Sequence, residues 1–170
     1  MKLLFIQKDP FVNLGLIYFS AYVKIKGHYT DLLVDSCCSD LMAEIRKVSP
    51  DLITISSTTG IHTWALDVAK KIKAQFSIPI LLGGHHPTFF PDVINDPNID
   101  MICVGEGELA ISALLDNFNS DITKVPGIYV KKNGVVYKND VAHNIENLDD
   151  LPFPDRNLYG RYPFITNQEN

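Results

Sequence analysis

The chain has 170 residues and a mass of 19.0 kDa, which is the size of one domain with a small appendage. Hydrophobic residues make up 46% and charged residues 21% of it, and no run approaches the roughly 18 apolar residues of a transmembrane helix, so the composition argues against disorder and against a membrane protein. The net charge is −5 and the lysines and arginines are scattered, which disfavours binding to nucleic acid.

The cysteines and the N-terminus are typical of an intracellular protein. Cys37, Cys38 and Cys103 cannot pair evenly, so we expect free thiols in a reducing compartment. No CxxC or CxxxCxxC spacing occurs, and we expect no metal or iron-sulfur site in this chain. Residues 1–7 are too short for a signal-peptide core. These features predict a cytoplasmic location.

Short apolar runs alternate with segments of helical spacing up to Phe118. The apolar runs predict strands buried on both faces: Leu3–Ile6, Leu32–Val34, Leu52–Ile55, Ile78–Leu82 and Met101–Val104. A helical segment follows each of them in turn: Leu14–Lys26 before Gly27, Leu41–Val48 after the potential cap Asp40, Ile61–Phe76, Thr88–Asn95 and Glu106–Phe118.

This alternation predicts a doubly wound α/β fold of the flavodoxin-like or Rossmann-like type. We expect a three-layer sandwich around a five-stranded parallel sheet of order 2-1-3-4-5. Such folds bind ligands at the carboxyl ends of the strands, close to the point where the strand order reverses. The candidate site therefore comprises the loops after the first, third, fourth and fifth strands.

The pattern changes after the fifth predicted helix. Gly127–Lys138 predicts a β-hairpin with Asn133 and Gly134 at its turn, because both residue types accept positive φ. Asn147–Arg156 has several prolines and predicts an extended strap. We therefore expect a Rossmann-like domain in residues 1–125, a hairpin appendage in 126–140 and a linker in 141–170.

Three of the candidate loops are rich in hydroxyls, glycines or carboxylates. A glycine pair beside four hydroxyls suggests a slot for a flat or extended ligand, although one hydroxyl is expected to cap the next helix. Backbone amides and carboxylates suit a ligand rich in amides or hydroxyls better than a phosphate, and no GxxxxGK[ST] or GxGxxG motif occurs after the first strand. The residues are Ser56, Ser57, Thr58 and Thr59, then Gly83 and Gly84, then Gly105, Glu106, Gly107 and Glu108.

Two adjacent histidines follow the glycine pair. His85 and His86 admit three interpretations: a hydrogen-bonding or capping role, contact with a cofactor, or metal ligation. The last is disfavoured because the side chains of adjacent residues diverge.

These residues resemble the motifs of cobalamin-binding domains. Ser56 with Thr58, and Gly83 with Gly84, are similar to the SxT and GG elements of that family, whose signature also includes DxHxxG after the first strand. The corresponding loop here, Gln7–Gly15, has no histidine. Because that histidine is the lower axial cobalt ligand in the family, the resemblance implies that cobalamin binds base-off, without a protein histidine.

A narrower resemblance extends over roughly Lys2–Arg156. The runs NLGLIYFSAYVKIKGHYTDLLVD, GGHHPTFFPDVI, IDMICVGEGE and LDDLPFPDR are similar to the N-terminal domain of class B radical S-adenosylmethionine (SAM) enzymes, including the anaerobic Mg-protoporphyrin IX monomethyl ester cyclase group. The resemblance implies a following barrel in the same polypeptide that binds a [4Fe–4S] cluster and SAM. No such motif occurs before Asn170, so we expect a non-catalytic fragment of a methyltransferase or cyclase.

The resemblance also implies a role for each loop. Gly83 and Gly84 would clear the path of the nucleotide tail of cobalamin, and Ser56 and Thr58 would bond to it. His86, and less directly His85, would lie at the corrin edge, with Glu106 and Glu108 accepting from its amide arms. The remaining predicted cofactor-binding residues are Asn13, Leu14, Gly15, Ser57, Thr59, Gly105 and Gly107.

Three other interpretations stay open. A receiver domain shares the strand order but needs an aspartate and a lysine where Ser56 and Gly105 stand, which argues against phosphotransfer. A flavodoxin-like module for flavin or a sugar nucleotide is a second alternative. The third is a scaffold domain of the cobalamin family that has lost its cofactor.

Overall fold

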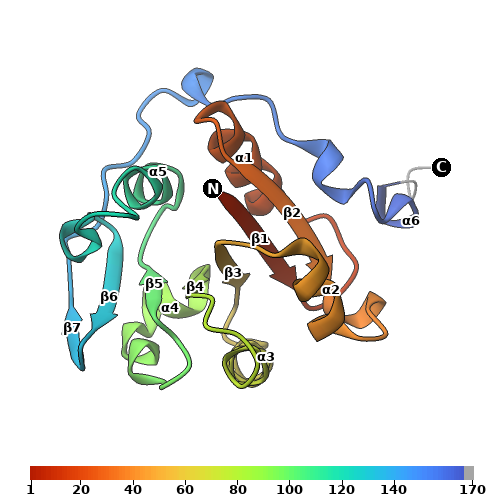
Figure 1. The fold of residues 1–170 in the computed structure, drawn as a ribbon. Helices are drawn as coiled ribbons and strands as arrows, with labels where there is room; N and C mark the ends of the chain where they lie inside the picture. Colours follow the sequence, from red (N-terminus) through yellow and green to blue (C-terminus); the bar gives the residue numbers. More distant parts are fainter. Residues whose placement is uncertain (167–170) are drawn as a thin grey trace.

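The structure is a computed structural model that describes residues 1–166, and its centre is one sheet of seven strands (Figure 1). Five parallel strands lie in the order β2-β1-β3-β4-β5, as the alternation of apolar runs predicts. They are β1 Lys2–Gln7, β2 Tyr29–Val34, β3 Leu52–Ser56, β4 Ile80–Gly83 and β5 Met101–Cys103. The fold is thus a mostly parallel, Rossmann-like α/β sheet.

The predicted hairpin forms, but it extends the same sheet, so the expectation of a five-stranded sheet is wrong. β6 Ile128–Lys132 pairs antiparallel with β5, and β7 Val135–Tyr137 pairs with β6. Without β6, the outer edge of β5 would present unpaired backbone N–H and C=O groups. Asn133 and Gly134 at the turn have φ of 53° and 78°, and a two-residue type I′ turn requires positive φ at both positions.

Helices cover both faces of the sheet (Figure 1). α1 Leu14–Ile25 and α5 Glu108–Asp116 pack on one face, and α2 Leu41–Val48 and α3 His62–Lys73 on the other. The remaining short helices are α4 His85–Phe89, α6 Pro163–Thr166 and the 3₁₀ turns η1 Asp35–Cys37, η2 Pro91–Asn95, η3 Ile122–Lys124, η4 Leu148–Asp150 and η5 Arg156–Tyr159. Within residues 1–166, no helix combines the length and the apolar composition that a membrane crossing needs.

Side chains determine where the first two helices begin. Asn13 Oδ1 accepts a hydrogen bond from the Leu16 N–H at 3.3 Å, and Asp40 caps α2 as predicted. The N-cap of α3 is Ile61, which has no side-chain cap bond, so the prediction of a hydroxyl cap is wrong. The hydroxyls of the preceding loop are left for other partners.

The helix after β4 begins earlier than predicted. The prediction was Thr88–Asn95, but α4 starts at His85, immediately after Gly84, and ends at Phe89. Phe90, with φ of −129° and ψ of 64°, is outside the helical region because Pro91 follows it, and the chain continues as the 3₁₀ turn η2. The early start moves His85 and His86 from a loop into the first turn of a helix.

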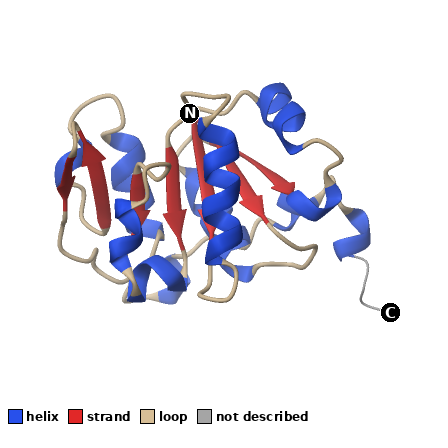
Figure 2. Ribbon diagram, turned by 90° about the horizontal axis from the view of Figure 1, so that it is seen from below, coloured by secondary structure: helices blue, strands red, loops and turns tan. Residues whose placement is uncertain are grey.

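The C-terminal segment lies beside α1 and β2, at the opposite edge of the sheet from the hairpin (Figure 2). Its buried side chains are Leu158, Tyr159, Tyr162 and Ile165. The Asp155 carboxylate accepts hydrogen bonds from Ser20 Oγ and Lys24 Nζ, both at 2.6 Å, and so fixes the start of the segment on α1. Residues 141–166 of the predicted linker are described, and residues 167–170 lie outside the described part of the chain. The role of residues 141–170 as a linker stays a prediction.

Candidate functional site

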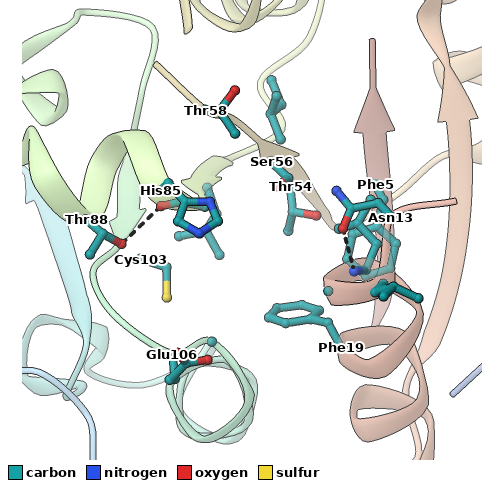
Figure 3. Close-up of a pocket in the computed structure, with 18 of the residues that line it drawn as sticks. Phe5, Asn13, Phe19, Thr54, Ser56, Thr58, His85, Thr88, Cys103 and Glu106 are labelled. Carbon is teal, nitrogen blue, oxygen red and sulfur yellow. Dashed lines mark hydrogen bonds between the residues drawn. The ribbon is translucent and has the colours of Figure 1, made fainter. Parts of the chain in front are cut away.

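A cleft of about 730 Å³ opens at the carboxyl ends of the parallel strands, where the loops after β1, β3, β4 and β5 meet (Figure 3). Most of the site residues predicted from the sequence line it. They are Asn13, Leu14, Gly15, Ser56, Thr58, Gly83, Gly84, His85, Gly105, Glu106, Gly107 and Glu108.

The two glycines at the end of β4 have different structural roles. Gly84 has φ of 92°, and a Cβ there would lie 2.8 Å from the Ser57 carbonyl oxygen. That close approach lets the Ser57 N–H bond to the Gly83 carbonyl at 2.9 Å and the His86 N–H to the Ser57 carbonyl at 3.0 Å. A Cβ on Gly83 would meet only Cys103 Cβ, at 3.9 Å. Gly84 therefore joins two loops, whereas Gly83 keeps the cleft open.

Three predicted site residues, Ser57, Thr59 and His86, are not among the residues that line the cleft. Ser57 is buried and contributes the backbone bonds between the two loops. The His86 ring is buried, and its Nδ1 lies within hydrogen-bond distance of Thr59 Oγ1, at 3.3 Å. The ring stacks on that of His62, with the two ring centroids 4.1 Å apart. His85, which the sequence makes the weaker candidate, is exposed and faces the cleft in Figure 3.

The buried position of His86 predicts a pH effect on stability. Burial, and then the nearby His62, lower the pKa of His86 below its ordinary 6.5. The neutral ring is therefore favoured in the folded state, and its stabilising contribution is complete above pH 6.5 and is lost as the pH falls through the lower folded pKa. We expect the urea concentration at the unfolding midpoint to decrease as the pH is lowered from 7 to 5. In His86→Gln this decrease should be smaller.

The adjacent exposed histidine provides the control for this measurement. His85→Gln is expected to keep the parental dependence of the urea midpoint on pH, because His85 is exposed. An unchanged slope in His86→Gln would show that the buried imidazole is not responsible.

The interior of the cleft is apolar, and this part was not predicted. Its lining includes Phe5, Leu16, Phe19, Ile55 and Leu81, which look like core residues in the sequence because they belong to strands and a helix. Thr54, which pairs with Phe5 across β1 and β3, adds a polar atom to this part of the lining. Thr54 Oγ1 is buried and has no hydrogen-bond partner among the described residues. A buried hydroxyl without a partner in a cleft wall is a candidate ligand contact.

Thr88 also lines the cleft and was missed as a site residue. Its hydroxyl donates to the Gly84 carbonyl at 3.0 Å and accepts from the Gly105 N–H at 3.2 Å, so it connects the loops after β4 and β5. In the sequence it has only the signal of a threonine near a helix start.

The electrostatic character of the lining is acidic. Glu106 and Glu108 are its charged residues, and Cys103 lies near them. Burial, followed by these two carboxylates, raises the pKa of the Cys103 thiol to about 12. The thiol is thus neutral, and the two carboxylates make this part of the lining unfavourable for a phosphate.

Comparison with known proteins identifies the family. A family model described as the B12 binding domain matches residues 8–115. The chain is 31% identical over 153 residues to an uncharacterized methyltransferase of Pyrococcus horikoshii, covering 85% of this chain and 33% of the relative. It is 28% identical over 156 residues to the anaerobic magnesium-protoporphyrin IX monomethyl ester cyclase of Synechocystis, covering 85% of this chain and 31% of the relative.

Solved structures share the fold. The cobalamin-dependent S-adenosylmethionine radical enzyme OxsB with aqua-cobalamin bound has a TM-score of 0.81 at 20% identity, over 96% of this chain and 25% of that one. The chain spans about a third of the length of the curated relatives it matches. The family match covers more than half of the residues and includes all four cleft loops, and the chain therefore belongs to the B12-binding domain family.

Proposed function

We propose that this chain binds cobalamin base-off, with the nucleotide arm of the cofactor in the cleft and no protein histidine on the cobalt. The observation that carries the proposal is the open cleft at the carboxyl ends of β1, β3, β4 and β5. A Cβ at Gly83 would meet only Cys103 Cβ, at 3.9 Å, and the Thr54 hydroxyl, which has no partner among residues 1–166, lies buried in the cleft wall. A cleft of about 730 Å³ is the size that encloses one small-molecule-sized group, which fits the arm rather than the whole cofactor.

The residues of the cleft divide between the two parts of such a ligand. Ser56, Thr58 and Thr54 offer hydroxyls to the nucleotide arm, and Glu106 and Glu108 accept hydrogen bonds from the amide side chains of the corrin. The exposed rings of Phe11 and Phe89 at the rim give apolar contact to a flat macrocycle. When bound, cobalamin supplies a cobalt centre that carries methyl groups.

The histidine-free mode follows from where the histidines lie. The loop between β1 and α1 has none, and the histidine of the cleft lining, His85, is on α4. Figure 3 places His85 across the cleft from Asn13. His85 is therefore a contact for the edge of the ligand and not a replacement for a histidine of the β1–α1 loop.

The whole protein is proposed to be a cobalamin-dependent radical SAM enzyme of the methyltransferase or cyclase type. Support comes from the curated relatives, one of which is named a cobalamin-dependent radical SAM methyltransferase, TokK of Streptomyces tokunonensis, 29% identical over 113 residues. In this proposal the iron-sulfur cluster and SAM belong to a following barrel of the same polypeptide. The chain works in the cytoplasm, where Cys37, Cys38 and Cys103, all free thiols in the structure, stay reduced.

Titration with hydroxocobalamin tests the binding proposal. We expect saturable binding with the absorbance spectrum of base-off cobalamin, and the same spectrum with His85→Ala, because that ring is not a cobalt ligand. A spectrum that changes on His85→Ala would contradict the histidine-free mode. Absence of saturable binding would contradict cofactor binding by this chain and favour a scaffold that has lost its cofactor.

A further inference from the structure

The loop between β1 and α1, residues 8–13, forms one wall of the cleft. It is exposed: Phe11 has 52% of its surface accessible, and its neighbour Val12 is also exposed. Exposed loops open at a low cost in free energy, so each hydrogen bond to the loop helps to keep it in one conformation.

Gln7, the last residue of β1, provides two of these bonds. Its side chain is buried, with 5% of the residue exposed, and it lies below the loop. Its Nε2 donates to the carbonyl oxygens of Asp9 and Phe11, the latter at 2.7 Å. The Gln7 amide thus adds two side-chain bonds to a loop that has a backbone bond of its own, from the Phe11 N–H to the Asp9 carbonyl at 3.1 Å.

Tyr159 orients the Gln7 amide from the C-terminal segment. It is fully buried, and its hydroxyl donates to Gln7 Oε1 at 2.6 Å and accepts from the Asn13 N–H at 3.0 Å. Asn13 caps α1 and lines the cleft, so one phenol reaches both ends of the loop. Burial raises the pKa of the Tyr159 phenol, which keeps it a donor.

We propose that Tyr159 is a positioning residue for the cobalamin site: through Gln7 and Asn13, its hydroxyl holds the β1–α1 loop in the conformation that forms one wall of the cleft. The proposal rests on the proposed function. It also means that the segment after the strap, which is remote in sequence from the family signature, supports the binding site from behind the loop without lining the cleft.

Other contacts hold the C-terminal segment independently of this hydroxyl. Asp155 is bonded to α1, the Tyr162 hydroxyl accepts from the Val34 N–H at 3.1 Å, and Arg161 pairs with Asp31 at 3.1 Å. Removing the Tyr159 hydroxyl therefore leaves the segment docked and changes only the network below the loop.

Tyr159→Phe removes the hydroxyl and keeps the ring in its apolar contacts. We expect its dissociation constant for hydroxocobalamin to rise about tenfold, since two buried hydrogen bonds are lost next to the site. In the cofactor-free chain, we expect faster hydrogen exchange at the Phe11 amide, which bonds to Asp9 within the loop.

Tyr162→Phe is the matched control, because it removes another buried hydroxyl from the same segment but one that bonds to β2 rather than to the cleft loop. Tyr159→Phe and Tyr162→Phe are expected to lower the melting temperature by similar amounts, since each loses a buried hydroxyl. Tyr162→Phe should leave both the dissociation constant for hydroxocobalamin and the exchange rate of the Phe11 amide unchanged. Gln7→Leu should repeat the effect of Tyr159→Phe, and the double variant should be less than additive because both act through one network.

Two results would overturn the proposal: equal dissociation constants for Tyr159→Phe and the parent, or equal losses in Tyr159→Phe and Tyr162→Phe. If the parental chain itself bound no hydroxocobalamin, the proposed function would fail. The exchange rate at Phe11 would then still show whether Tyr159 orders the loop, because that measurement needs no cofactor.

Discussion

Gly83→Leu is expected to abolish saturable hydroxocobalamin binding while the melting temperature stays near that of the parent. Gly83 lines the cleft at the carboxyl end of β4, its φ is not in the left-handed region, and a Cβ there meets only Cys103 Cβ at 3.9 Å. A leucine side chain can therefore be accommodated by the fold, but it occupies the slot proposed for the nucleotide arm. The measurement is the same absorbance titration, paired with thermal unfolding.

Two other glycines provide the controls for this experiment. Gly60→Leu adds the same side chain at a position with open space and away from the cleft lining, so it should bind as the parent does. Gly84→Ala should instead lower the melting temperature, because its φ is 92° and the new Cβ would lie 2.8 Å from the Ser57 carbonyl. Tight binding by a well-folded Gly83→Leu protein would refute the slot.

Cys103 is expected to react with iodoacetamide far more slowly than Cys37. The alkylating species is the thiolate, and burial with two nearby carboxylates raises the pKa of Cys103 from 9.0 to about 12. This shift alone lowers the thiolate fraction at pH 8 about a thousandfold, and burial adds steric protection. Cys37 is exposed, so it should be labelled first.

Peptide mass spectrometry of a labelling time course at pH 8 follows each cysteine separately. Labelling in concentrated urea is the control, since unfolding removes both burial and the fixed carboxylates and should bring the rates of Cys37 and Cys103 together. A Cys103 rate within tenfold of the Cys37 rate in the folded chain would contradict the assigned environment of the thiol.

The sheet order and the position of the cleft could be predicted because they depend on local patterns. Continuous apolar runs such as Leu52–Ile55 indicate strands buried on both faces, and right-handed crossovers then restrict how these strands can be arranged. The edge at which the loops gather follows from the direction of parallel strands. Polar residues in the loops after those strands could be predicted as site residues because these loops gather at the same edge of the sheet.

The orientation of individual side chains could not be predicted in this way. His85 and His86 are adjacent, and only the start of α4 at His85 decides that the first faces the cleft and the second packs on His62. The distinct roles of Gly83 and Gly84 depend on the distance between two backbones. The hydrogen bond between Tyr159 and Gln7 joins residues 152 positions apart, so no local spacing indicates it.

The position of the two C-terminal elements affects how the molecule can be dissected. The hairpin β6–β7 pairs with β5 at one edge of the sheet, and residues 155–165 pack along β2 at the other. A protein shortened to residues 8–115, the range of the family match, would lose β1, which lies between β2 and β3, together with β6, the outer partner of β5. The remaining strands would then present unpaired edges, and bare strand edges pair with other chains. The smallest portion that keeps the sheet whole is therefore longer than the portion that defines the family.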